Sequence, residues 1–375
     1  MQSSNILIGN SKRIPQLDIL RFVAVNLVIF FHGGGIQNHP ESFSAKLINP
    51  IASGGWLGVD LFFVLSGFLV SGLLFQELLK TGHISIGSFL IRRAFKIYPA
   101  FYFMMILSWI GIFTLTSPEM IARKLQWKLF ASEFLFVQNY FQNIWCHTWS
   151  LAVEEHFYLA LLGIIFFLTG PGRKQKLSML PWIVIPFCLL VLVSRSLFTL
   201  EHPNGSAPLQ THFRLDSLFF GVLLSYLYHF KPRSLLFITH RKKTAWTVSL
   251  CLVMSLFIGG PHALWVKTIG LTFAYLGFGG ILILSLALPH PKGSTKSISD
   301  FTAWIGQHSY SIYLWHVPIQ VVILSTLVRR FGLQDSFWTT QALFFILSWT
   351  LGILMAKCIE FPLLSIRNRI FRKSY

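Results

Sequence analysis

Apolar stretches of bilayer length recur about ten times along this chain of 375 residues. A helix needs roughly 20 apolar residues to cross the hydrocarbon core of a membrane. In lipid the backbone has to satisfy its own hydrogen bonds, so such spans fold as helices. We therefore predict an all-α fold, a polytopic transmembrane helix bundle of about ten spanning helices, near residues 17–36, 56–79, 99–116, 147–169, 181–200, 213–230, 245–260, 265–289, 309–329 and 337–359.

The composition indicates one membrane-embedded unit. Hydrophobic residues make up 54% of the chain and charged residues 12%, and the mean hydropathy is +0.61. No soluble domain, repeat or long linker interrupts the apolar pattern, so we expect a single transmembrane domain over residues 1–375. The loop 117–146 is the longest between spans, and it contains an amphipathic piece around residues 128–140.

The net charge of +18 is concentrated between the apolar spans. Basic residues cluster on alternate loops, as the excess of Lys and Arg on the cytoplasmic side of membrane proteins requires. We expect both termini in the cytoplasm, membrane lipids as partners of the basic loops, and no nucleic-acid partner. The cytoplasmic segments would be 1–16, 80–98, 170–180, 231–244, 290–308 and 360–375, with basic clusters that include Arg173, Lys174, Arg372 and Lys373.

The first span carries ionisable side chains at membrane depth. Ten residues lie between Arg21 and His32, a spacing that on a helix gives about 16 Å of rise and about 20° of rotation. These two side chains therefore share one face, with Asp18 one turn from Arg21. Because ionisable groups at this depth are costly and mark function, we predict that this face lines a cavity.

Polar residues also interrupt later spans. Glu154 lies in the outer half of the fourth span, where a buried carboxylate needs a partner. A histidine exchanges protons near neutral pH, which suggests proton transfer involving His32 and Glu154. Further candidate site residues are Asp60 in the second span, Arg93 and Lys96 before the third, Trp149 at the start of the fourth, and Tyr310, Tyr313 and His316 in the ninth.

These residues also have plain structural interpretations. Arg93 and Lys96 fit ordinary cytoplasmic anchors, and Trp149 and the tyrosines of the ninth span fit an interfacial aromatic belt. His316 precedes Pro318, so it could bond a carbonyl that the proline leaves free. Neither HExxH nor GxSxG occurs, and the four cysteines form no CxxC. We therefore expect no metal site and no serine-hydrolase chemistry.

Taken in order, the polar motifs resemble the acyltransferase-3 family of integral-membrane O-acyltransferases. The resemblance extends over about residues 14–362. The segments that carry it are LDILRFVAVNLVIFFH (17–32), GVDLFFVLSGFL (58–69), RRAFKIYP (92–99), WSLAVEEHFYL (149–159), RLDSLFFGVLL (214–224) and SYSIYLWHVP (309–318).

The resemblance implies roles for individual residues. It assigns catalysis to Arg21, His32 and Glu154. It places an acyl-CoA donor at an Arg-x-x-Arg motif that appears here as Arg93 and Lys96, with lysine in place of the second arginine. The other positions that match family motifs are Arg214 and Asp216 (RLD), Tyr310, Tyr313 and His316 (SYxxYLxH), and Glu360 and Pro362 (E-x-P). Because the chain ends soon afterwards, we expect no soluble esterase-like extension.

The function implied is that of a membrane O-acyltransferase of the bacterial inner membrane. It would move an acyl group, expected to be acetyl, from cytoplasmic acyl-CoA to a hydroxyl of a sugar, polysaccharide precursor or lipid-linked glycan, with no bound cofactor. His32 would be the general base and Glu154 would orient its imidazole. Two alternatives stay open: acylation of a macrolide-type metabolite, and a proton-coupled transporter, although the internal repeats common in transporters are not seen.

Overall fold

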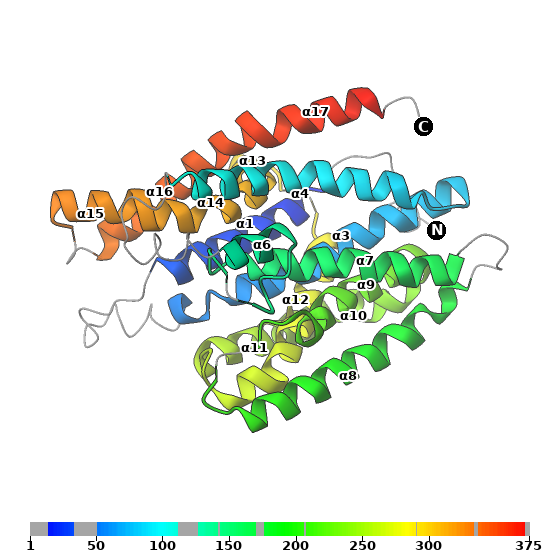
Figure 1. Cartoon of the computed structure of the whole chain (residues 1–375). Coiled ribbons are helices and arrows are strands. Elements are labelled where there is room, and N and C mark those ends of the chain that lie inside the picture. Colours follow the sequence, from blue (N-terminus) through cyan, green and yellow to red (C-terminus); the bar gives the residue numbers. More distant parts are fainter. Residues whose placement is uncertain are drawn as a thin grey trace.

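The computed structural model describes residues 14–33, 51–111, 127–141, 143–169, 176–205, 208–289, 291–333 and 337–371. Most of the long helices run roughly along one direction, and α1 begins on the side of the bundle where α17 ends (Figure 1). The long helices are α1 (Pro15–His32), α3 (Leu57–Thr81), α4 (Ile86–Trp109), α7 (Trp149–Thr169), α8 (Leu180–Glu201), α9 (Leu215–Phe230), α11 (Lys242–Gly259), α12 (Leu271–Leu286) and α16 (Phe337–Met355).

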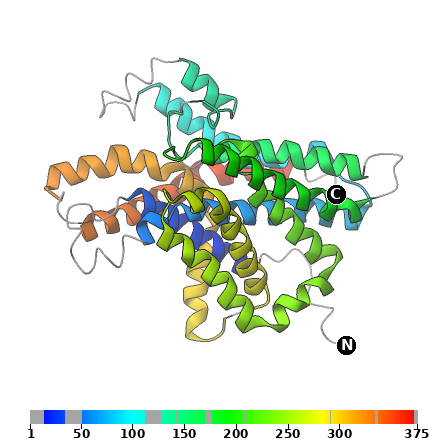
Figure 2. The same ribbon diagram turned by 90° about the horizontal axis from the view of Figure 1, so that it is seen from below.

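Shorter helical pieces complete the bundle. They are α6 (Trp127–Phe134), α10 (Leu236–His240), α13 (Ser294–Gln307), α14 (Ser309–Pro318), α15 (Ser325–Phe331) and α17 (Phe361–Ile370). Turns of π-helix at Val266–Gly270, Ile319–Leu324 and Ala356–Glu360 lead into α12, α15 and α17. The α6 helix matches the amphipathic piece expected around residues 128–140, and it lies at the rim of the bundle beside α4 (Figure 2).

The predicted all-α membrane fold is confirmed. Each of the ten predicted spans overlaps a helix. Seven helical segments of the described chain are long and apolar enough to cross a membrane, and α9 is a shorter apolar helix. The described residues contain no strand. The predicted sidedness stays a prediction, and the basic residues Arg173, Lys174, Arg372 and Lys373 lie outside the described residues.

The α4 helix begins earlier than the apolar pattern suggested. We expected a cytoplasmic loop up to residue 98, but α4 starts at Ile86, where the Ser85 hydroxyl accepts a hydrogen bond from Ser88 N. Arg93 and Lys96 therefore lie on a helix. Hydropathy ends a span where charges begin, whereas Arg and Lys are good helix formers, so the helix continues past the apolar window.

Close approaches between helices depend on glycine. A Cβ on Gly67 of α3 would lie 1.9 Å from Leu218 O of α9, and one on Gly306 of α13 would lie 1.8 Å from Asp18 O of α1. Glycine alone leaves room for such contacts, which are typical of helix interfaces in membranes. As a result α3 packs between α1, α9 and α12 in the middle of the bundle.

Candidate active site

A cavity of about 620 Å³ lies among α1, α3, α4, α7, α9 and α14. Apolar side chains of α3 form much of its wall. The structure brings together at this cavity six residues predicted from the sequence: Arg21, Arg93, Lys96, Glu154, Tyr310 and Tyr313. The prediction that the face shared by Arg21 and His32 lines a cavity is therefore confirmed only for Arg21, because His32 lies outside the cavity wall.

The cations of the cavity differ in how they are paired. Arg21 Nη1 donates to Asp18 Oδ1 at 2.8 Å. The Arg93 guanidinium lies 5.6 and 5.7 Å from the ring centres of Phe89 and Tyr158, and within the described chain it forms no ion pair with a carboxylate. Arg93 therefore offers the cavity a positive charge that no direct carboxylate contact neutralises.

Lys96 is held by the carboxylate of Glu360. Its ammonium donates to Glu360 Oε1, and the hydroxyl of Ser311 donates to Glu360 Oε2 at 2.8 Å. The Tyr310 ring lies 5.6 Å from the ammonium, and its hydroxyl donates to Ile97 O at 2.7 Å. Two motifs distant in sequence, around residues 96 and 360, thus form one structural unit at the cavity.

Glu154 lies with the cations and not with His32. It accepts a hydrogen bond from Tyr158 OH at 2.8 Å and lines the same cavity as Arg21 and Arg93. No hydrogen bond joins Glu154 to His32 in the described part of the chain. Arg21 and His32 are about 16 Å apart along α1, and Glu154 lines the cavity with Arg21, whereas His32 does not. The structure does not match our expectation that Glu154 orients the imidazole of His32.

The imidazole of His32 has contacts on α1, on α14 and in the segment before α7. On α1 its Nδ1 lies 3.0 Å from Val28 O, and on α14 it lies 3.2 Å from Nε2 of His316. Its Nε2 lies 4.0 Å from Sγ of Cys146, which precedes α7 and is exposed. A carbonyl can only accept, so we assign the proton of neutral His32 to Nδ1. Its Nε2 is then an unprotonated base on the side that faces Cys146.

A proline in α14 organises the neighbouring histidine. Pro318 has no N–H to offer to Leu314 O, and Nε2 of His147 donates to that carbonyl at 3.0 Å. We proposed this kind of role for His316, but His316 instead bonds Tyr313 O through Nδ1 at 2.5 Å. His32, His316 and His147 form a cluster, with ring centres 4.8 Å and 4.9 Å apart in succession.

Tyr313 connects the cavity with the histidine cluster. Its hydroxyl donates to His147 O at 2.8 Å and lies 2.6 Å from Oγ of Ser150. Both Tyr313 and Ser150 line the cavity. The wall of the cavity thus includes the cations and also Tyr313 and Ser150, which belong to the hydrogen-bonded frame of the histidine cluster.

Asp60, Arg214 and Asp216 lie outside the cavity wall in two buried ion pairs. Arg214 Nη2 donates to Asp60 Oδ1 at 2.9 Å, and its guanidinium lies 5.3 Å from the ring centre of Trp149. Asp216 accepts from Nη1 of Arg195 at 2.7 Å. These contacts join α3, α8, α9 and α7, so the three predicted residues hold the bundle around the site.

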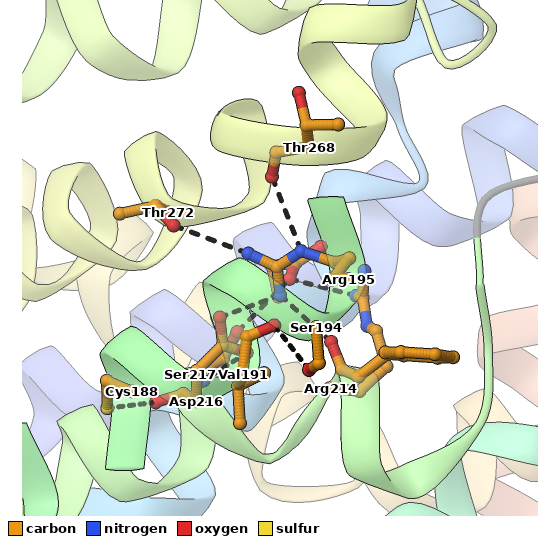
Figure 3. Close-up of polar contacts among 11 residues, drawn as sticks. Cys188, Val191, Ser194, Arg195, Arg214, Asp216, Ser217, Thr268 and Thr272 are labelled. Carbon is orange, nitrogen blue, oxygen red and sulfur yellow. Dashed lines mark hydrogen bonds and ion pairs between the residues drawn. The ribbon is translucent and has the colours of Figure 1, made fainter. Parts of the chain in front are cut away.

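Sequence reasoning missed Arg195. It is fully buried on α8 and also donates to the carbonyls of Phe213 and Thr268 and to Oγ1 of Thr272, at 2.9, 3.3 and 3.3 Å (Figure 3). The available signal was an arginine inside an apolar span, which is expensive unless it is paired.

Glu133 of α6 was also missed. Its Oε1 accepts from Ile144 N and from Oγ1 of Thr148, both at 2.9 Å. Burial raises the pKa of Glu133 to about 7. Through these hydrogen bonds the carboxyl group fastens the segment that carries Cys146 and His147 and leads into α7.

Fold and site together define a multi-pass membrane protein with an internal cavity whose polar side chains suit acid–base chemistry. Among the described residues no group of three His, Cys, Asp or Glu side chains is arranged to hold a metal ion. The sequence pattern of the acyltransferase domain matches residues 14–358. The chain therefore belongs to the acyltransferase-3 family.

The curated relatives are bacterial O-acetyltransferases. The peptidoglycan O-acetyltransferase OatA of Listeria monocytogenes is 29% identical over 357 residues, which cover 87% of this chain and 52% of the relative. The O-acetyltransferase OatA of Staphylococcus aureus is 30% identical over 344 residues, which cover 84% and 52%. The chain thus spans about half the length of these relatives. No solved structure is significantly similar to it.

Proposed function

We propose that this protein is a membrane O-acyltransferase that moves an acetyl group from acetyl-CoA to a hydroxyl of a cell-wall glycan or its lipid-linked precursor. The observation that carries the proposal is the cavity, whose wall contains both cations and the frame of the histidine cluster. The acetyl preference and the glycan acceptor are supported by the relatives, which are named O-acetyltransferases, one of them of peptidoglycan.

His32 is the general base of the proposed reaction. Its Nε2 takes the proton of the acceptor hydroxyl while the hydroxyl oxygen attacks the thioester carbon. The carbon–sulfur bond then breaks, and the CoA sulfur leaves with the proton held on Nε2. The products are the O-acetyl ester and CoA, and His32 returns to its neutral state. The remaining acceleration comes from holding the two substrates in reacting geometry.

The cavity is the proposed donor site. Its volume lies in the usual range for small-molecule sites, about 300–1,000 Å³, and its walls combine apolar side chains with cations. An acyl-CoA offers a long, largely uncharged arm and a phosphorylated end. The arm fits between the apolar walls, and the phosphates fit Arg93, whose charge has no carboxylate in direct contact among the described residues.

Replacing Arg93 by alanine should raise the KM for acetyl-CoA about tenfold, the effect of losing one charge-assisted hydrogen bond. The wild-type KM should also rise with salt, because the contact is electrostatic. Lys96→Arg should keep or tighten donor binding, since a guanidinium can also pair with Glu360.

The KM for acetyl-CoA of both variants is measured from the steady-state rate of CoA release. Arg92→Lys is the control, because Arg92 pairs with Glu77 and does not line the cavity. If all these proteins had the same KM for acetyl-CoA, Arg93 would be an ordinary cytoplasmic anchor and not part of the donor site.

Purified protein in detergent tests the function itself. We expect release of CoA from acetyl-CoA that depends on added peptidoglycan fragments or lipid-linked glycan, with acetyl esters detected on the sugar by mass spectrometry. Acetylation of a macrolide in the same assay would favour the small-metabolite alternative. Proton-coupled uptake into proteoliposomes without consumption of CoA would favour a transporter.

Cys146 provides a natural probe of sidedness. We propose an inner-membrane location with cytoplasmic termini, which places Cys146 and His32 at the outer surface. In a Cys251→Ala, Cys358→Ala background, a membrane-impermeant maleimide should label Cys146 in spheroplasts and not in inverted vesicles. The label should also block transfer, because Sγ lies 4.0 Å from Nε2 of His32.

Cys146→Ala is the control for that experiment and should be neither labelled nor inhibited. Labelling of Cys146 only in inverted vesicles would reverse the proposed orientation. The acceptor would then approach from the cytoplasm, and a soluble metabolite would become the better substrate.

A further inference from the structure

We propose that His316 is the positioning residue of His32 and that the two rings act as a histidine pair. In this pair His316 accepts the Nδ1 proton of His32 and supports the imidazolium that forms during transfer. The inference rests on the proposed function, because it presumes that His32 is the base. It assigns to His316 the part that the sequence had suggested for Glu154.

The geometry of the two rings carries the proposal. His316 Nε2 lies 3.2 Å from His32 Nδ1, and the ring planes meet at 69°. Nδ1 of His316 faces Tyr313 O at 2.5 Å. A carbonyl has no proton to give, so neutral His316 carries its proton on Nδ1 and presents an unprotonated Nε2 to His32. The His32 Nδ1–H is then shared between Val28 O and His316 Nε2.

Both rings therefore have defined tautomers before the substrate arrives. When Nε2 of His32 takes the proton of the acceptor hydroxyl, the ring becomes a cation with a proton on each nitrogen. The Nδ1–H bond to His316 then becomes charge-assisted and stronger. After the CoA sulfur removes the proton from Nε2, the pair returns to its initial state. No net proton moves to His316, so the reaction balances as written above.

The surroundings of His316 hold its ring in place. It is fully buried, and the rings of His147 and Phe344 lie 4.9 and 6.5 Å from its own. His147 cannot serve as the partner of His32 in this arrangement. Its Nε2 is engaged with Leu314 O, and its Nδ1 has no hydrogen-bond partner within the part of the chain that the structure describes. Among the described residues, the other titratable side chains that contact the pair are Tyr313 and Cys146.

Two substitutions separate positioning from packing. His316→Leu removes the acceptor atom and should lower kcat about 10- to 100-fold, part of the contribution of a general base. The KM for acetyl-CoA should stay unchanged, because His316 does not line the cavity. His316→Gln retains a carbonyl oxygen that can accept from Nδ1 and should recover at least half of that loss on a logarithmic scale.

A double-mutant cycle tests whether His316 acts through His32. Adding His316→Leu to His32→Ala should cost nothing further, since effects of residues that work as a unit are not additive. His308→Leu is the matched control. His308 is buried, bonds Trp304 O through Nδ1 at 2.8 Å and has its ring contacts with Trp304 and Phe361 and not with His32, so kcat should change less than twofold.

The outcomes distinguish the inference from the function on which it rests. Full activity of His32→Ala would overturn the proposed mechanism and the pair with it. A strong loss in His32→Ala with wild-type kcat in His316→Leu would overturn the pair alone. Equal losses in His316→Leu and His316→Gln, or a further loss in the double variant, would also reject the pair.

Discussion

His32→Ala is expected to lower the rate of acetyl transfer about 100-fold or more, while the protein stays folded and abundant in the membrane. General-base catalysis contributes about 10²–10⁴-fold, and His32 is the histidine whose Nε2 is left unprotonated on the side of an exposed residue. A single half-buried ring at the end of α1 contributes little to packing, so stability should change little.

The measurement is kcat for acetyl-CoA-dependent transfer, together with membrane abundance and thermal unfolding in detergent. Affinity for CoA serves as the internal control. It should be unchanged because His32 lies outside the cavity wall. Near-wild-type kcat in a well-folded His32→Ala protein would remove the histidine from the chemistry.

Arg195→Met is expected to cause the largest loss of stability, about 3–5 kcal/mol, the typical cost of breaking a buried ion pair from one side. The substitution leaves the carboxylate of Asp216 buried without its cation and removes donors from Phe213 O, Thr268 O and Thr272. Thermal unfolding of the purified protein measures the effect. Any variant that remains folded should have an unchanged KM for acetyl-CoA.

A second substitution distinguishes the contribution of the ion pair to stability from the contribution of side-chain volume. Arg195→Met combined with Asp216→Leu replaces both charges by apolar groups, which often restores stability. We expect the double variant to unfold above the temperature of Arg195→Met. A single variant as stable as the wild type would show that the pair is dispensable for the fold.

The fold was largely predictable because membrane insertion depends on local composition. Apolar length and the need for internal hydrogen bonds placed all ten predicted spans on helices. The start of α4 was missed because helix formation does not end where hydropathy ends. The short helix α13, whose Gly306 packs directly against α1, was not predicted within the segment 290–308.

The candidate site was predictable in its residues but not in its pairings. Arg21, Arg93, Lys96 and Glu154 were each singled out, and they do meet at one cavity. The histidine partner of His32 and the lysine partner of Glu360 were not foreseen. Residues 32 and 316, and residues 96 and 360, are brought together by helix packing, which leaves no spacing signal in a single sequence.

The sequence alone therefore determined that the chain is a multi-pass helical membrane protein, which side chains break its apolar spans, and that Arg21 and His32 share a face of α1. Each of these properties depends on the composition of a single segment and on the helical repeat within it. Only the tertiary structure decided that Glu154 lines the same cavity as the cations and that His316 contacts His32. Such contacts depend on the depth and rotation at which separate helices pack, and the packing of the whole bundle determines both.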